Sequence, residues 1–181
     1  MVFATLFFIL ANKKEKFLLL SMIQAITETN LTFYIQTEDN RINTSVSSSN
    51  IRHLIKFTND FSGAVQYAYS TSHLITDRYT RIQLTYNTTP NVYTGYVDFK
   101  PSGYYKYEVF EVSWTGAVSI SSGNAPVNEN DVLTPSASTK GVVQGLVTKG
   151  KMNVTDKNGT SQVQYNQHTQ EQGSNYIYYG Q

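Results

Sequence analysis

The run from Gly103 to Trp114 (GYYKYEVFEVSW) constrains the fold of this chain more than any other segment. Aromatic and β-branched residues favour strands, and a run of this length is typical of a strand in the middle of a sheet. Side chains alternate between the two faces of a strand. One face carries Tyr105, Tyr107 and Val109, and the other carries Phe110, Val112 and Trp114. We therefore expect a β-bulge, or burial on both sides, near Val109 and Phe110.

The rest of the chain consists of short β-prone runs separated by polar turn clusters, without a sustained helical spacing of apolar residues. Tyr, Phe and Trp make up 13% of the 181 residues, which favours strands, and this length suits one buried domain. We expect strands at 31–37, 53–59, 64–70, 80–86, 93–99, 104–114, 145–154, 161–165 and 175–179. Alternation predicts three core faces, namely Ile82, Leu84 and Tyr86; Val65, Tyr67 and Tyr69; and Gly95, Val97 and Phe99. The sequence thus predicts an all-β sandwich.

Composition along the chain predicts four regions. Residues 22–118 hold the sandwich core, and residues 119–140, which have few large apolar side chains, form a flexible linker or a long loop. Residues 141–181 supply C-terminal strands that either complete the sandwich or form an assembly tail. Asp156–Gly159 is a strong hairpin turn leading into 161–165.

Residues 1–21 form the fourth region, which opens with an almost wholly apolar run from Met1 to Ala11. A secretory signal carries its positive charges before the apolar run, whereas here Lys13, Lys14 and Lys16 follow it. Eleven residues are also too few to span a bilayer, so a membrane partner is not expected. Two interpretations stay open: an upstream extension of a protein that starts at Met22, or a membrane-associated leader.

Charge and residue types exclude several kinds of site. The formal net charge is +1, which gives no long-range field for nucleic acid, so nucleic acid is not an expected partner. No cysteine is present, which excludes disulfides and thiolate metal sites. His53, His73 and His168 are far apart and lack the short spacing of metal ligands. We therefore expect no metal and no cofactor, and surface or half-buried histidines.

Two carboxylates, Glu108 and Glu111, could suggest a glycosidase, whose chemistry needs two facing carboxyl groups. Three residues apart on a strand, they point to opposite faces, so we interpret them as solvated charges at a sheet edge. The acidic segments Asn128–Asp131 and Asp156–Gly159 lack the further acidic ligand of a calcium loop. The sequence thus predicts no catalytic residues and no enzyme.

Tyrosines are the remaining candidates for binding, because their rings anchor protein interfaces and also stack on sugars. Tyr104, Tyr105 and Tyr107 are expected to serve sandwich packing. The candidate interface is Tyr176, Ile177, Tyr178 and Tyr179, which close an otherwise polar tail. Both uses of the rings, for protein or for sugar, stay open.

Five segments in this order resemble small virion-associated proteins of tailed bacteriophages: Leu54–Asp60, Asp77–Ile82, Gly95–Phe99, Gly103–Glu111 and Val147–Lys151. The resemblance covers about Leu31 to Val154. It implies an immunoglobulin-like antiparallel β-sandwich with a C-terminal β-hairpin or tail. It also implies a structural protein of the capsid, neck or tail, located in the virion, whose partners are other virion proteins in multiple copies.

The leading functional hypothesis is a non-enzymatic bacteriophage structural protein that assembles through its tail and its exposed strand edges. The alternative is a carbohydrate-binding or adhesin module that grips host glycans with exposed tyrosines. A third hypothesis, a membrane-anchored β-domain, requires the leader to be genuine.

Overall fold

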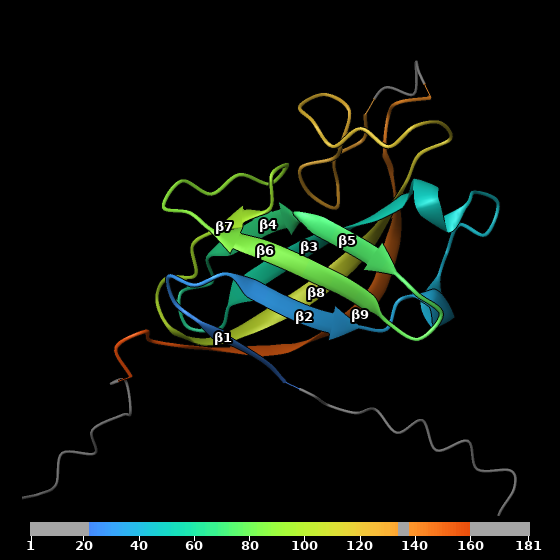
Figure 1. Cartoon of the computed structure of the whole chain (residues 1–181). Helices are drawn as coiled ribbons and strands as arrows, with labels where there is room; N and C mark the ends of the chain where they lie inside the picture. The colour runs from blue at the N-terminus through green and yellow to red at the C-terminus, as the bar shows by residue number, and fades with distance from the viewer. Residues whose placement is uncertain (1–21, 134–137, 160–181) are drawn as a thin grey trace, which may run out of the picture.

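The computed structural model describes residues 22–133 and 138–159, and over these ranges the chain is almost entirely β (Figure 1). The strands are β1 (Ile23–Ile26), β2 (Leu31–Ile35), β3 (Ile51–Asn59), β4 (Val65–Tyr69), β5 (Ser72–Ile75), β6 (Thr80–Tyr86), β7 (Tyr96–Val97), β8 (Gly103–Ser113) and β9 (Val142–Thr155). Two short 3-10 helices, η1 (Glu38–Asn40) and η2 (Ser48–Asn50), lie between β2 and β3. The predicted all-β class is confirmed.

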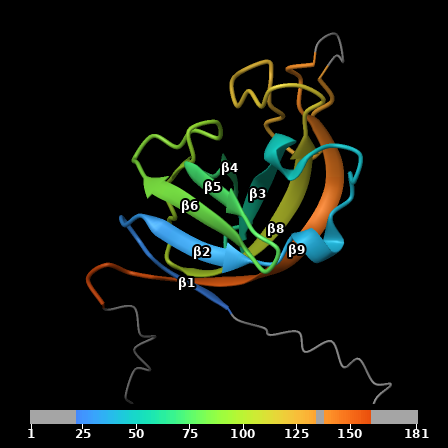
Figure 2. The same cartoon turned by 45° about the vertical axis from the view of Figure 1, so that its right-hand side comes forward.

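The strands form two sheets. Sheet A has the order β1-β9-β8-β3-β4, and sheet B has the order β2-β6-β5 with β7 added beside β6. Sheet A curls strongly, so that β8 and β9 bend around one side of the molecule (Figure 2). The expectation of purely antiparallel sheets is wrong, because β1 pairs with β9 and β7 pairs with β6 in parallel. β1 and β9 are far apart in sequence, and β6 and β7 are joined by a long turn. Neither pair therefore has the short turn sequence that predicts a hairpin.

The β8 strand lies in the middle of sheet A and is buried on both faces. Tyr105, Tyr107 and Val109 face the space between the sheets, while Val112 and Trp114 lie under the loop that follows β8. The expected register shift is confirmed, since the pairing of β8 with β9 slips between Val109 and Phe110 and again between Glu111 and Val112. The extra residues belong to β9, so β8 keeps an unbroken register with β3.

One side of the two-sheet structure is closed by a strand that changes sheets. The chain passes from β4 in sheet A to β5 in sheet B through only Ser70 and Thr71. Tyr69 donates its amide to the Val92 carbonyl at 2.8 Å, and Thr85 donates to the Gly95 carbonyl at 3.0 Å. The first bond joins β4 of sheet A to the loop between β6 and β7, and the second holds the start of β7 beside β6 in sheet B. On the opposite side β1 and β2 belong to different sheets and do not pair.

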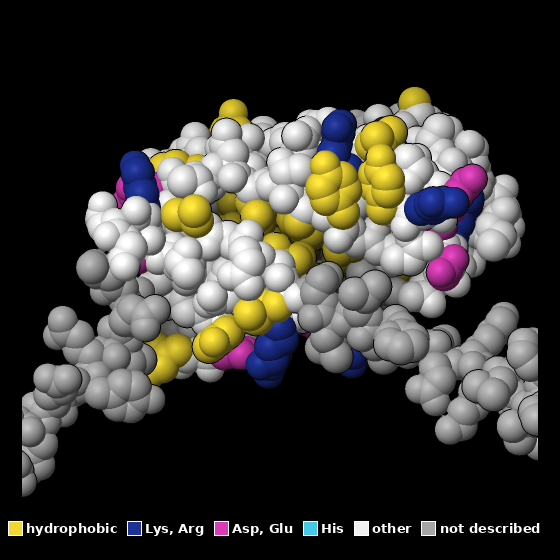
Figure 3. Space-filling model, turned by 60° about the horizontal axis from the view of Figure 1, so that its bottom comes forward, with side chains coloured by type: hydrophobic (Ala, Val, Ile, Leu, Met, Phe, Trp, Pro, Cys, Tyr) yellow, Lys and Arg dark blue, Asp and Glu magenta, His cyan; other side chains and the backbone are white. Residues whose placement is uncertain are grey.

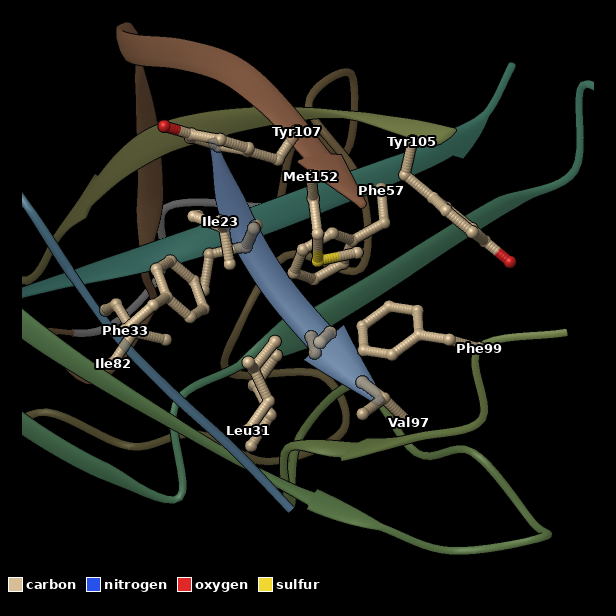
Figure 4. Packing of buried hydrophobic residues seen from close by; sticks show 14 of the residues in the cluster. Ile23, Leu31, Phe33, Phe57, Ile82, Val97, Phe99, Tyr105, Tyr107 and Met152 are labelled. Carbon is tan, nitrogen blue, oxygen red and sulfur yellow. The ribbon is translucent and has the colours of Figure 1, made fainter. Parts of the chain in front are cut away.

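The main core fills the space between the sheets. It contains Ile55 and Phe57 from β3, Ile82 and Leu84 from β6, and Val109 from β8, each at most 1% exposed. Figure 4 shows the rings of Phe57 and Phe99 in this cluster, with centroids 5.0 Å apart. The predicted core positions Ile82, Leu84, Val97 and Phe99 are thus confirmed.

A second, smaller core lies on the outer face of sheet A. Trp114, which is 0% exposed, packs there with Leu54, Tyr69, Val112 and Ala125, and its Nε1 donates to the Thr139 carbonyl at 3.0 Å. The predicted core face of β4 is only partly right. Ala68 faces the main core, whereas Tyr69 belongs to this second core and Val65 is 48% exposed.

No helix in the described ranges is both long and apolar enough to cross a membrane. The apolar run Met1–Ala11 and the predicted strands 161–165 and 175–179 lie outside those ranges.

Candidate functional site

The solvent-facing side of sheet B carries two exposed tyrosines. Tyr34 on β2 is 58% exposed, and Tyr79, in the turn before β6, is 40% exposed. Their ring centroids are 5.3 Å apart and their planes meet at 82°, an edge-to-face arrangement. Arg81 and Leu74 lie beside them, and we call Tyr34, Leu74, Tyr79 and Arg81 the aromatic face. Figure 3 shows large hydrophobic side chains next to a basic one in the upper part of the view.

Strand register places these side chains together. Tyr34 lies opposite Arg81, and Arg81 lies opposite Leu74, so one cross-strand row holds three of the four residues. Their neighbours Phe33, Ile35 and Ile82 point inward to the core, so alternation turns this row outward. Tyr79 is fixed by a tight turn in which its amide bonds the Thr76 hydroxyl at 3.1 Å and its carbonyl accepts from the Thr76 amide at 2.9 Å.

The geometry favours a protein contact over a sugar platform. Two perpendicular rings do not offer one shared flat surface, whereas stacking on a sugar uses ring faces. Tyrosine and arginine are the residues enriched in energetically dominant positions of protein interfaces. The aromatic face combines both types with an exposed leucine.

A histidine pair, with His53 buried and His73 half-buried, links the two sheets on the inner side. Nδ1 of His53 on β3 lies 2.8 Å from Nε2 of His73 on β5, so one nitrogen donates and the other accepts. Burial lowers the pKa of both imidazoles to about 3, and the nearby Arg52 guanidinium acts in the same direction. Imidazoles with so low a pKa are weak bases at neutral pH. A cavity of about 300 Å³ lies beside His73 and is lined also by Ser48, Ser49 and Arg52.

Glu111 is the other buried polar group of this region. It lies opposite His53 in the β3–β8 pairing and is 1% exposed. Its two carboxylate oxygens accept the backbone amides of Ile42 and Asn43 at 2.9 and 2.8 Å. Glu111 therefore holds the segment after η1 against sheet A.

Glu108 lies on the opposite, outer face of β8, as predicted, with its carboxylate 3.7 Å from Lys56 Nζ. Lys56 also bonds Glu129 at 2.6 Å, and this hydrogen bond raises the pKa of Lys56. Tyr67 donates its hydroxyl to the same Glu129 carboxylate, and burial followed by this bond raises the pKa of Tyr67 to about 12. These contacts attach the loop around Glu129 to the sheet.

Two expectations about charged residues are therefore wrong. His53, expected at the surface or half-buried, is 2% exposed and contacts His73 because the chain crosses from sheet A to sheet B between them, whereas His73 is half-buried as expected. The glutamates are not edge charges, because β8 is a central strand, and Glu111 is buried with two amide donors. His168 lies outside the described residues.

Among the residues that the structure describes, no group of three or more His, Asp or Glu side chains could hold a metal ion. Tyr105 and Tyr107 are buried as expected for packing residues, and Tyr104 is 57% exposed. The candidate interface Tyr176, Ile177, Tyr178 and Tyr179 lies outside the described ranges. Sequence reasoning missed Tyr34 and Tyr79. For Tyr34 the signal was its position between Phe33 and Ile35, which turns it outward by alternation.

Comparison of this chain with protein-family models, with curated proteins and with solved structures finds no match.

Proposed function

We propose that the protein is a non-enzymatic structural component of a bacteriophage virion that assembles with other virion proteins, in multiple copies, through the aromatic face of sheet B. The observation that carries the assembly role is the exposed Tyr34–Tyr79 pair with Arg81 and Leu74 beside it. The virion context rests on the sequence resemblance. An immunoglobulin-like arrangement is part of the same proposal, and the two packed sheets of the all-β fold support it.

Interface energetics support this use of the face. A few aromatic and arginine side chains usually carry most of the binding free energy of a protein contact, about 2 kcal/mol or more each when truncated. Repeated copies on a particle add avidity, so each contact can be individually weak. The aromatic face lies on a rigid sheet whose inner side is well packed, so its side chains are positioned before a partner binds.

The test compares the incorporation of variants into particles. Tyr34→Ala and Tyr79→Ala each remove one exposed ring, and Tyr104→Ala removes a similarly exposed ring from the outer face of sheet A. We expect the first two variants to be depleted from purified particles in quantitative mass spectrometry and the Tyr104 variant to be incorporated normally. Absence of the wild-type protein from particles would overturn the virion role. Equal incorporation of all three variants would overturn the role of the aromatic face.

Carbohydrate binding is the second candidate, favoured by the polar row next to the exposed rings. Thr32 lies opposite Gln83, and Gln83 lies opposite Ser72, so hydroxyl and amide groups border Tyr34 on the same face. A single exposed ring with such donors can hold one sugar. Binding on a glycan array that is lost in Tyr34→Ala, together with normal particle incorporation of that variant, would favour this function over assembly.

A further inference from the structure

The two sheets leave an open seam between β1 and β2. β1 is the outer strand of sheet A and β2 is the outer strand of sheet B, so each has an edge that pairs with no other strand in the described ranges. The strands are joined by the short turn Thr27–Asn30, which is fixed at both ends. Thr27 donates its amide to the Thr155 carbonyl at 2.9 Å, and Asn30 Oδ1 accepts the Tyr86 amide at 2.9 Å. The seam is therefore closed at this turn and open away from it.

The floor of the seam is apolar. Ile23 on β1 and Leu31, Phe33 and Ile35 on β2 point into the main core, but they keep 5–9% of their surface exposed. Residues deeper in the same core, such as Phe57, are 0% exposed. Figure 3 shows hydrophobic side chains within a hollow on this underside of the molecule, and Figure 4 shows Ile23 and Phe33 pointing into one cluster.

The chain leaves the described fold beside this seam. β9 ends at Thr155, and Asp156–Gly159 form a tight turn in which Gly159 donates its amide to the Asp156 carbonyl at 3.0 Å. Gly159 has a φ of 74°, which suits the reversal of the chain. The Lys157 amide donates to Thr27 Oγ1 at 2.9 Å, which fixes the turn at the closed end of the seam.

A strand that follows this turn cannot form an ordinary hairpin with β9. Both edges of the end of β9 are occupied: Val154 pairs with Ala25 of β1 on one side and with Gly103 of β8 on the other. The nearest vacant edge is that of β1, about 10 Å from β9 at two strand spacings. The Lys157 amide already holds the turn beside Thr27, at the end of β1, so the chain after Gly159 has to cross only about one strand spacing of roughly 5 Å to reach that edge. Two residues can span about 7 Å, so the connection is long enough.

The next residues have the pattern of a half-buried strand. Ser161-Gln162-Val163-Gln164-Tyr165 alternates, with Val163 and Tyr165 on one face and two glutamines on the other. We propose that Ser161–Tyr165 of the same chain adds antiparallel to the free edge of β1 and fills the seam. Val163 and Tyr165 then cover Ile23 and Phe33, and the glutamines face water. This inference does not depend on the virion role.

Cysteine pairs test the placement, and the chain has no native cysteine to interfere. In an antiparallel arrangement the outward residue Gln24 of β1 lies directly opposite either Gln162 or Gln164. We expect one of the two double variants, Gln24→Cys with Gln162→Cys or with Gln164→Cys, to form a disulfide within the monomer under mild oxidation. Non-reducing gels and peptide mass spectrometry identify the bond. The matched control is Val65→Cys with Gln164→Cys, since Val65 is exposed on β4 at the opposite edge of sheet A.

Disulfide-linked dimers from the Gln24 pairs would overturn the proposal in favour of a strand from a second copy. Failure of both Gln24 pairs to crosslink, or equal crosslinking by the Val65 control, would overturn it as well.

Hydrogen exchange gives a second readout in the full chain. The Thr27 amide points to β9, so by alternation the amides of Gln24 and Ile26 point to the seam. We expect these two amides to be protected in the wild type and to exchange about tenfold faster in Val163→Asp, where the buried carboxylate disfavours docking. The control Gln164→Asp changes an outward residue and keeps the protection. Equal exchange in all three proteins would contradict the proposal even if Val163→Asp is otherwise folded.

Discussion

The contact between buried His53 and half-buried His73 predicts that the fold loses stability in mild acid. Both imidazoles have a pKa near 3 in the folded protein, against 6.5 as the ordinary value. In the unfolded chain both histidines bind protons as the pH falls through 6.5, whereas in the folded protein they stay neutral until about pH 3. The unfolded state therefore binds more protons between these two values. Stability is complete above about pH 7 and falls as the pH decreases through this window.

The size of the effect follows from the two pKa values. Between about pH 7 and pH 5.5, each histidine contributes a loss of about 1 kcal/mol in the free energy of unfolding, so the pair contributes about 2–3 kcal/mol. Carboxylates with ordinary or lowered pKa values titrate mainly below this range. A loss of this size is a large fraction of the 5–15 kcal/mol, roughly, that stabilises a typical domain. With a urea slope of about 1–3 kcal/mol per molar, the midpoint moves by roughly 0.8–2.5 M.

Fluorescence of Trp114 provides the assay. It is the chain's one tryptophan and is 0% exposed, so unfolding transfers it to water and shifts its emission. Urea titrations at the two pH values give the midpoints. The control is the double variant His53→Leu with His73→Leu, which removes both titrating groups and replaces both hydrogen-bond partners together. This variant retains His168 and every carboxylate. The wild type and the variant therefore differ in the pH dependence of their unfolding free energy only by the contribution of the two histidines. Equal pH dependence in the wild type and the double variant, or a wild-type midpoint that rises on acidification, would refute the reasoning.

Two further perturbations are predicted from contacts within sheet A. Glu111→Ala leaves the Ile42 and Asn43 amides without their acceptor, and we expect it to lower the free energy of unfolding in urea by about 2–4 kcal/mol. Glu108→Ala removes a half-exposed ion pair and should lower it by about 1 kcal/mol or less. Equal costs would contradict the burial argument. Gly150→Ala places a Cβ 2.5 Å from the Tyr107 hydroxyl oxygen and should destabilise the fold by about 1–3 kcal/mol. Combining it with Tyr107→Leu should recover part of that loss in a double-mutant cycle, and strict additivity would exclude the clash.

The long strands were predictable from the sequence because their local pattern and their burial agree. Burial alternates along β6 from Thr80 to Leu84 and along β8 from Tyr105 to Glu111, and the inward residues Ile82, Leu84 and Val109 are buried as expected. The change of buried face near Phe110 was also predictable from the sequence. A strand with apolar residues on both faces must pack against other residues on both faces, here the two cores. Local sequence decides such features.

Features that depend on distant partners were not predictable in this way. β1 has only four residues and forms because β9 pairs with it. Of the predicted strand at 93–99, only the two residues of β7 form a strand. Asn91 pairs with Tyr96, and its side-chain oxygen accepts the Tyr93 amide, so the chain turns before β7. The contact between His53 and His73 requires knowledge of where the chain changes sheets. The spacing of residues along the sequence does not show where the chain passes from one sheet to the other.

The parallel pairing of β1 with β9 also affects the order of folding. Ala25 and Thr155, which are bonded across this pair, are 130 residues apart in the chain. Closing so large a loop lowers the entropy of the chain before the contacts between β1 and β9 can offset that cost. This pairing therefore forms late in folding. During synthesis β1 emerges from the ribosome before the other described strands but cannot pair with β9 until β9 has followed. The inward side chains Ile23 and Ala25 thus stay unburied for most of translation. Of the described strands, β1 has the longest delay between its own synthesis and that of its pairing partner.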